Sequence, residues 1–143
     1  MGKRIQIISE FDPIRRVLHV SAERPVLVDD ECALDEILNR VKHDLVESSG
    51  DGRCYLMLDI SRIVVEPKLA GRFFMRLRQL RDDYLYPDGL VRYGLQISGR
   101  LVRIDRSKPD MDYPALVRTS HEARKYIDRL RLAMRQEVQT TNL

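Results

Sequence analysis

The chain has 143 residues, of which 43% are hydrophobic and 33% charged, so a disordered, collagen-like or low-complexity protein is excluded. One domain is expected, because the length is short for two. The net charge of +3 is uneven: residues 1–61 carry 8 basic and 12 acidic groups, whereas residues 62–143 carry 17 and 10. An acidic front half and an Arg-rich back half predict a polar contact surface, with nucleic acid or an acidic protein as partner.

Two short strands and a helix are predicted first. Residues 4–10 (RIQIISE) and 16–22 (RVLHVSA) have strand patterns on either side of an Asp12-Pro13 turn, which is typical of a hairpin. Acidic residues at positions 29–31 begin the first helix, since negative charge is favourable at a helix N-terminus. Its inner face consists of apolar residues at spacings of three and four: Leu34, Ile37, Leu38, Val41 and Leu45.

The middle of the chain predicts a buried strand, a second helix and another strand. Residues 54–60 (CYLMLDI) are almost continuously apolar, which is typical of a central strand covered on both faces in a partly parallel sheet. The second helix begins after Glu66 with Pro67 in its first position, where a missing N–H costs nothing. Residues 86–89 (YPDG) predict a turn, and residues 91–98 (VRYGLQIS) predict the next strand.

The last third of the chain predicts a short helix at residues 99–107, a strand at residues 114–118 and a long final helix. Thr119 and Glu122 fit a capping box at the start of the final helix. The inner face of this helix is a set of apolar or aromatic positions at helical spacing: Ala123, Tyr126, Ile127, Leu130 and Met134. Residues 139–143 are polar and are expected to form a frayed tail.

The predicted order is therefore strand, strand, helix, strand, helix, strand, short helix, strand, helix. Strands that alternate with helices indicate a layered α/β arrangement in which helices pack on a sheet. We expect a single α/β domain over residues 1–138, with a mixed, mostly parallel sheet of about five strands.

Three segments, taken in this order, resemble the STAS domain of sulfate transporters and anti-sigma-factor antagonists. STAS domains commonly have a strand that ends in Leu-Asp-Leu/Ile-Ser, matched here by residues 58–61 (LDIS). Residues 96–99 (QISG) match a later strand that ends in a small polar residue, and residues 114–123 (PALVRTSHEA) match the segment before the last helix. The resemblance covers about residues 14–131 and extends to looser STAS-like relatives, among them lipid-binding domains. It implies a cytoplasmic, bacterial signalling module that binds a protein partner and performs no catalysis.

One departure from the family pattern changes what the resemblance implies. Phospho-switched members carry Asp-Ser-Ser/Thr-Gly at the start of the second helix, where a kinase phosphorylates a hydroxyl. Aligned from Leu58-Asp59, this chain has residues 67–70 (PKLA), and the nearest hydroxyl, that of Ser61, lies at the strand end. We therefore expect no Ser phosphorylation switch at this site. The edge of the second helix as a docking surface is carried over from the resemblance.

Basic residues mark this predicted docking surface. Lys68, Arg72 and Arg76 recur every four residues and form one stripe on the second helix, and Arg62 precedes the helix. Arg suits bidentate contact with carboxylate or phosphate groups, so a protein partner and a nucleic-acid partner both fit the stripe. An ordinary solvated helix face is the alternative interpretation.

Two other functions are left open by the sequence. The Arg-rich back half could bind nucleic acid through basic residues of the predicted short helix, which are Arg100, Arg103 and Arg106. A small molecule or lipid could bind in a pocket beside Asp59, Ser61 and Ser98, since ligands bind at the carboxyl ends of strands in open α/β sheets. Asp59 that only caps a loop N–H is the structural alternative.

No catalytic, metal or cofactor site is predicted. No Gly-rich phosphate loop follows a strand, and neither cysteine has a His at zinc-ligand spacing. Cys32 and Cys54 have no CxxC pattern, so two reduced, buried thiols of a cytoplasmic protein are expected. The N-terminus has no signal-peptide pattern, and no apolar run approaches the ~20 residues of a membrane span. The oligomeric state is left open, with a homodimer as one possibility.

Overall fold

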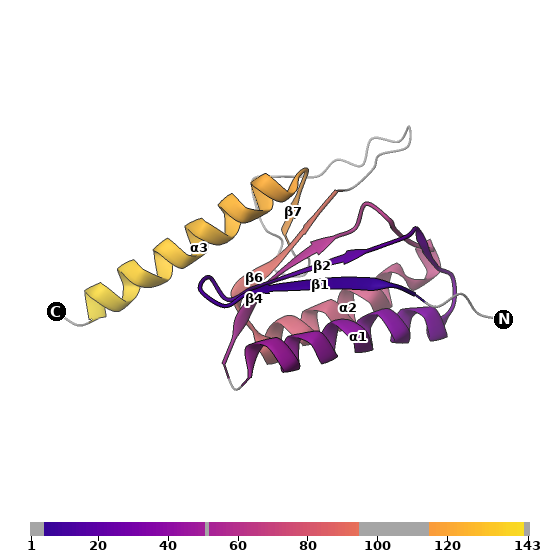
Figure 1. Cartoon of the computed structure of the whole chain (residues 1–143), viewed down its shortest axis with the longest axis horizontal. Helices are drawn as coiled ribbons and strands as arrows, with labels where there is room; N and C mark the ends of the chain where they lie inside the picture. Colours follow the sequence, from indigo (N-terminus) through magenta and orange to yellow (C-terminus); the bar gives the residue numbers. More distant parts are fainter. Residues whose placement is uncertain (1–4, 51, 95–114, 142–143) are drawn as a thin grey trace.

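A mixed sheet of five strands forms the centre of the computed structural model, which describes residues 5–50, 52–94 and 115–141 (Figure 1). In spatial order the strands are β1 (Ile7–Asp12), β2 (Val17–Ala22), β4 (Cys54–Asp59), β6 (Leu85–Tyr93) and β7 (Ala115–Val117). β1 is antiparallel to β2, and the other neighbouring pairs are parallel. The predicted hairpin is confirmed. So is the central position of β4, whose side chains are buried from Cys54 to Leu58.

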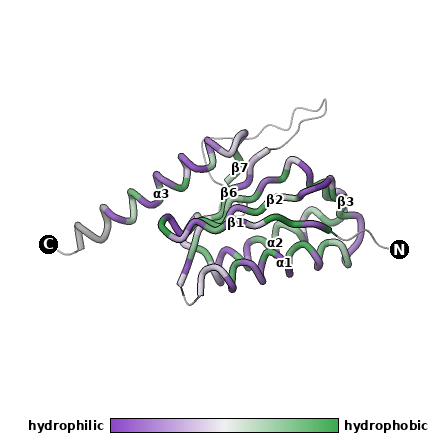
Figure 2. Tube along the Cα trace, in the orientation of Figure 1, coloured by the Kyte–Doolittle hydropathy of each residue, from purple (hydrophilic) through white to green (hydrophobic). Residues whose placement is uncertain are grey.

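Helices cover the two faces of this sheet. α1 (Glu31–Ser49) and α2 (Pro67–Tyr84) lie side by side on one face, and α3 (Ser120–Thr141) crosses the other (Figure 1). Alternate strand residues therefore enter two cores, a larger aliphatic one against α1 and α2 and a smaller one under α3. In Figure 2, hydrophobic residues are frequent in the strands, whereas hydrophilic and hydrophobic positions alternate along α3. The predicted fold class, a single α/β domain with a mostly parallel sheet, is confirmed.

The helix starts follow the capping chemistry of the sequence. Asp30 is the N-cap of α1, and its Oδ1 accepts a hydrogen bond from the Ala33 N–H at 2.8 Å. Before α3, Thr119 Oγ1 accepts a hydrogen bond from the Glu122 N–H at 3.2 Å, as a capping box requires. The returning carboxylate of Glu122 accepts instead from the N–H of Arg118, one residue before the expected donor. The predicted helix start is therefore correct, with a shifted second hydrogen bond.

Two short strands are missing from the predicted order. β3 (Val26–Val28) and β5 (Ile63–Val65) form a separate parallel sheet of two strands. Three residues are too few to establish a period of two, so neither strand has a recognisable sequence pattern. Each strand leads directly into a helix, which places this small sheet at the N-terminal ends of α1 and α2.

The turn predicted at residues 86–89 is wrong, because these residues lie inside β6. The pairing of β6 with β4 shifts there, from Cys54 opposite Leu85 to Leu56 opposite Leu90. The turn-forming sequence is accommodated as an irregularity of the strand, which is typical of a β-bulge.

Two further predictions concern the last third of the chain. α3 includes residues 139–141, which the sequence assigns to a frayed tail. The short helix predicted at residues 99–107 and the strand end at residues 95–98 lie outside the described residues. The strand predicted at residues 114–118 is confirmed in its described part as β7.

Candidate functional site

The basic stripe predicted on the second helix lies along the boundary between α2 and α1. Arg72 forms an ion pair with Glu31, and Arg76 forms one with Asp35. Arg76 also donates from Nη2 to Oδ1 of Asn39 at 3.2 Å. These three partners lie on α1, so acidic residues of the front half neutralise part of the basic back half within the chain. The uneven distribution of charge along the sequence is therefore explained in part by ion pairs between α1 and α2.

Individual ion pairs at this boundary are expected to contribute little to stability, because water screens them. The Asp35 side chain is 60% exposed and that of Arg76 is 28% exposed. We expect Arg76→Ala to lower the free energy of unfolding by about 0.5 kcal/mol. Urea unfolding of Arg76→Ala, Asp35→Ala and the double variant measures the coupling. A coupling energy above about 1.5 kcal/mol would contradict the assignment of a screened surface pair.

An exposed apolar pair lies beside the start of α2. Leu27 of β3 and Val64 of β5 are register partners, and they are 55% and 59% exposed. Lys68, in the first turn of α2, pairs with Glu66 at 3.4 Å rather than with α1. We define the β3–β5 surface as Leu27, Val64, Lys68 and Arg72. It joins two of the predicted docking residues to apolar residues that the sequence does not single out.

Two hollows adjoin the β3–β5 surface. A groove of about 1010 Å³ is lined by residues of β3 and the start of α1, with Leu27 and Cys32 among them. A second hollow of about 370 Å³ lies between the first turns of α1 and α2, where Glu31 and Lys68 contribute to its lining. Arg62, the remaining predicted docking residue, donates from Nη1 to the carbonyl oxygen of Glu23. Arg62 therefore ties the β5 side of this small sheet to the segment that precedes β3.

Asp59, at the end of the central strand, is engaged locally. Its Oδ1 accepts a hydrogen bond from the Ser61 N–H at 2.9 Å. This is the capping of a loop N–H that the sequence allows as the alternative to a ligand-binding role for Asp59. The backbone of Gly94 lies against both residues, since a Cβ on Gly94 would lie 2.8 Å from Asp59 Oδ1. Ser98 lies outside the described residues. The same holds for the predicted nucleic-acid contacts, which are Arg100, Arg103 and Arg106.

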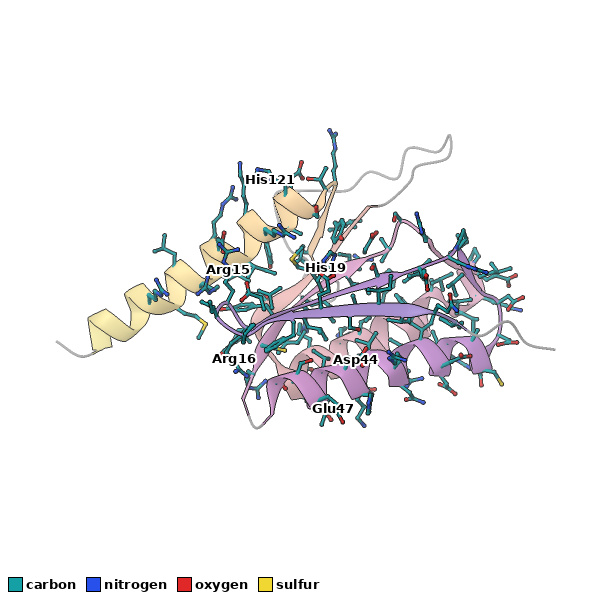
Figure 3. All side chains as sticks on the ribbon, viewed as in Figure 1. Arg15, Arg16, His19, Asp44, Glu47 and His121 are labelled. Atoms are coloured by element: carbon teal, nitrogen blue, oxygen red, sulfur yellow. The ribbon has the colours of Figure 1, made fainter. Side chains whose placement is uncertain are left out.

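A polar pair that the sequence does not predict lies between the sheet and α3. His19 Nε2 and the Tyr93 hydroxyl form a hydrogen bond, with ring centroids 5.6 Å apart. His19 also lines a cavity of about 260 Å³ beside α3 (Figure 3). Burial, followed by the charge of Asp59, raises the pKa of Tyr93 to about 12. The phenol therefore keeps its proton at neutral pH and remains able to donate or accept a hydrogen bond.

Acid is expected to destabilise the fold through His19. Burial and then the charge of Arg124 lower the pKa of His19 from 6.5, against the opposing effects of Asp59 and Glu10. The unfolded chain therefore binds this proton more readily than the folded chain. The contribution of His19 to stability is complete above pH 6.5 and is lost as the pH falls from 6.5 toward the lowered pKa.

Urea unfolding above and below this window measures the effect. His19→Gln, which keeps a side chain able to hydrogen-bond Tyr93, should lose less stability on acidification than the parent protein. Equal losses in the two proteins would show that another group controls the acid sensitivity.

The two thiols differ, and the prediction that both are buried is wrong for Cys32. Cys32 is exposed in the first turn of α1, whereas Cys54 is buried in β4, where burial raises the pKa of its thiol to about 11. An aromatic disulfide reagent should therefore modify one thiol quickly in the native protein and both in denaturant. Cys32→Ser should abolish the fast phase, and a fast phase that survives this change would contradict the assignment.

The described residues, 5–50, 52–94 and 115–141, contain no group of three His, Cys, Asp or Glu side chains that could hold a metal ion. None of the helices in this part of the chain is long and apolar enough to cross a membrane. No family model, curated protein or solved structure matches the chain.

Proposed function

We propose that the protein is a non-catalytic regulatory module of STAS-like type that docks a protein partner through the β3–β5 surface. The observation that carries the proposal is the pair Leu27 and Val64, which are both apolar, adjacent and more than half exposed. Exposed apolar side chains grouped beside charged ones are typical of protein-binding patches. The STAS resemblance supports the same region, because it implies docking at the edge of the second helix.

Lys68 and Arg72 supply the polar rim of this surface. They pair with Glu66 and Glu31, and all four side chains are at least 40% exposed. Such pairs contribute little in water, so a partner's carboxylates can replace the chain's own at a small cost in free energy. The rim therefore supports recognition of acidic groups around a small apolar centre.

We propose that no Ser phosphorylation controls this docking. Residues 67–70 (PKLA) form the first turn of α2 directly after its N-cap, Glu66, and none of the four has a hydroxyl. We place the module in the cytoplasm, in line with Cys32 and Cys54, which are free thiols.

Affinity capture from a lysate of the source cells tests the proposal. The bait is the full chain, and the test variant carries Leu27→Glu and Val64→Glu. A matched control carries Val46→Glu and Leu132→Glu, because these apolar residues are 46% and 57% exposed, on α1 and α3. We expect a captured protein that the control retains and the test variant loses.

A charge-reversed variant, Lys68→Glu with Arg72→Glu, should also lose this protein while its thermal unfolding stays close to that of the parent. Recovery of the same proteins by all the variants would overturn the proposal.

A further inference from the structure

We infer that a notch between the β1–β2 turn and α3 docks an acidic, amphipathic segment of a partner protein. The notch has a volume of about 200 Å³ and is lined by residues of the turn, β4, β6 and α3. All the charged residues in its lining are arginines: Arg15, Arg16, Arg131 and Arg135. We call this site the arginine notch. The β3 label lies at the other end of the domain in Figure 2, so this site is separate from the β3–β5 surface.

One wall of the arginine notch is a helix that extends past the sheet. Figure 1 shows α3 passing the β1–β2 turn and continuing away from the body of the domain. Among the side chains described for α3, those of residues 120–135, Ala123 and Ile127 are buried, whereas Met134 is 37% exposed. Helices gain most of their stability by packing an apolar face. A partner segment in the notch would give the turn of α3 around Met134 the packing that the sheet gives the first turns.

The opposite wall presents an apolar side chain on a fixed turn. Ile14 is 86% exposed, the largest exposure among the exposed large hydrophobic residues of the described chain. Asp12 Oδ1 accepts hydrogen bonds from the N–H groups of Ile14 at 3.0 Å and Arg15 at 3.2 Å. Arg16, which has a φ of 57°, donates to the carbonyl oxygens of Arg53 and Ser49 at 2.7 and 2.9 Å. Because the turn is already ordered, binding at Ile14 costs little further conformational entropy.

The charge of the notch is available to a partner. Arg15 and Arg135 make no ion pair with any described side chain, and Arg131 lies 3.7 Å from Asp128, beyond hydrogen-bond distance. Figure 3 places Arg15 at the turn beside α3, whereas Arg16 lies on the side of the turn toward the end of α1, where it donates to the carbonyl oxygens of Arg53 and Ser49. Guanidinium groups bind carboxylates with two parallel hydrogen bonds. The carboxylates of an acidic segment can therefore pair with the arginines of the notch, while an apolar residue of the same segment inserts between Ile14 and Met134.

Nucleic acid fits the arginine notch less well than an acidic protein segment does. Binding of single strands depends on aromatic faces that are free to stack on bases. Tyr55 is 3% exposed, and its ring packs against that of Tyr86 with centroids 4.8 Å apart. The Tyr55 hydroxyl also donates to Met134 Sδ at 3.3 Å. The aromatic residues of the notch are therefore already engaged.

A second copy of this chain is also a poorer occupant. Its acidic helix is α1, where Glu31 and Asp35 already pair with α2 and Asp44 pairs with Arg40 at 3.1 Å. Two copies of α3 would bring Arg131 and Arg135 toward their own counterparts, which is a repulsive arrangement. The charges favour a different, acidic chain.

The test of this inference is the binding of a fluorescently labelled helical peptide, measured by fluorescence anisotropy. The peptide is rich in Glu and has Leu residues at helical spacing along one face. We expect saturable binding to the full chain that weakens with salt, and no binding of the same peptide with Lys in place of Glu. Arg131→Glu with Arg135→Glu should weaken the affinity by about tenfold or more. Ile14→Ser, which leaves the charge unchanged, should also weaken the affinity.

The matched control reverses two exposed charges of the same helix, Lys125→Glu and Arg129→Glu, whose positions point away from the inner face. Its affinity should stay within about twofold of the parent, and circular dichroism should show that all variants fold. If the control and the notch variant lost the same affinity for the peptide, the change in net charge alone would explain the loss, and the inference would be overturned.

Two further measurements identify a different occupant. Tighter binding of a labelled single-stranded oligonucleotide, lost in the Arg131→Glu, Arg135→Glu variant, would assign the notch to nucleic acid and overturn the inference. A parent dimer in analytical ultracentrifugation that this variant converts to a monomer would assign the notch to a second copy, with the same consequence. Neither result depends on the β3–β5 surface.

Discussion

Leu56→Ala is expected to lower the free energy of unfolding by about 3 kcal/mol. Leu56 has no exposed surface and lies in β4, the middle strand of the sheet. Its side chain belongs to the larger core, which is bounded by α1 and α2 on the side opposite the sheet. Truncation removes apolar contacts and leaves a cavity that strands held on both sides cannot close by shifting.

Urea unfolding followed by circular dichroism measures this loss. Val46→Ala on α1 is the control, because Val46 is 46% exposed and should change stability by only about 0.5 kcal/mol. If Leu56→Ala cost no more than the control, the central position of β4 would be wrong.

Gly94→Ala is expected to lower the free energy of unfolding by about 2 kcal/mol. Gly94 follows β6 with a φ of +85°, a conformation that residues with a Cβ rarely adopt. The added Cβ would also lie 2.8 Å from Asp59 Oδ1 and 3.0 Å from the Ser61 Cβ. The backbone and the loop after β4 would both have to shift.

Gly71→Ala, which is the same chemical change at another position, is expected to raise the free energy of unfolding. Gly71 lies within α2, and a Cβ there would have no atom within 4 Å outside the helix's own backbone. Alanine should therefore stabilise the helix by about 0.5 to 1 kcal/mol. Thermal and urea unfolding of the two variants should move in opposite directions. Similar shifts in the two variants would contradict the left-handed conformation and close contacts assigned to Gly94.

The parts of the fold that sequence predicts correctly are those with a long or chemically distinctive pattern. The continuous apolar run of β4 predicts its central place, and the acidic residues at positions 29–31 predict the start of α1. In contrast, β3 and β5 are three residues each, and residues 86–89 have turn chemistry although they lie inside β6. The strands β3 and β5 are missed because they are too short to show a pattern, and residues 86–89 are misassigned because their local sequence is compatible with a turn. In both cases the neighbouring strands determine whether the segment pairs.

The candidate sites depend more strongly on tertiary structure. Arg72 and Arg76 form the predicted stripe, but only the packing of α1 against α2 shows that acids of the front half face it. Leu27 and Val64 are far apart in sequence and meet through the pairing of β3 with β5. His19 could have been suspected, since it alternates with apolar residues in a predicted strand, although its partner Tyr93 could not.

The largely parallel sheet has a consequence for the order of folding. Among the described strand pairs of the main sheet, β1 and β2 are joined by a short turn, whereas β2 with β4 and β4 with β6 are each separated by a whole helix. Closing such long loops costs chain entropy before the strands can pair, and sheets of this kind fold more slowly than helical bundles. The hairpin is therefore positioned to form early. The turn around Ile14, which borders the arginine notch, would then be among the first surfaces that the nascent chain completes.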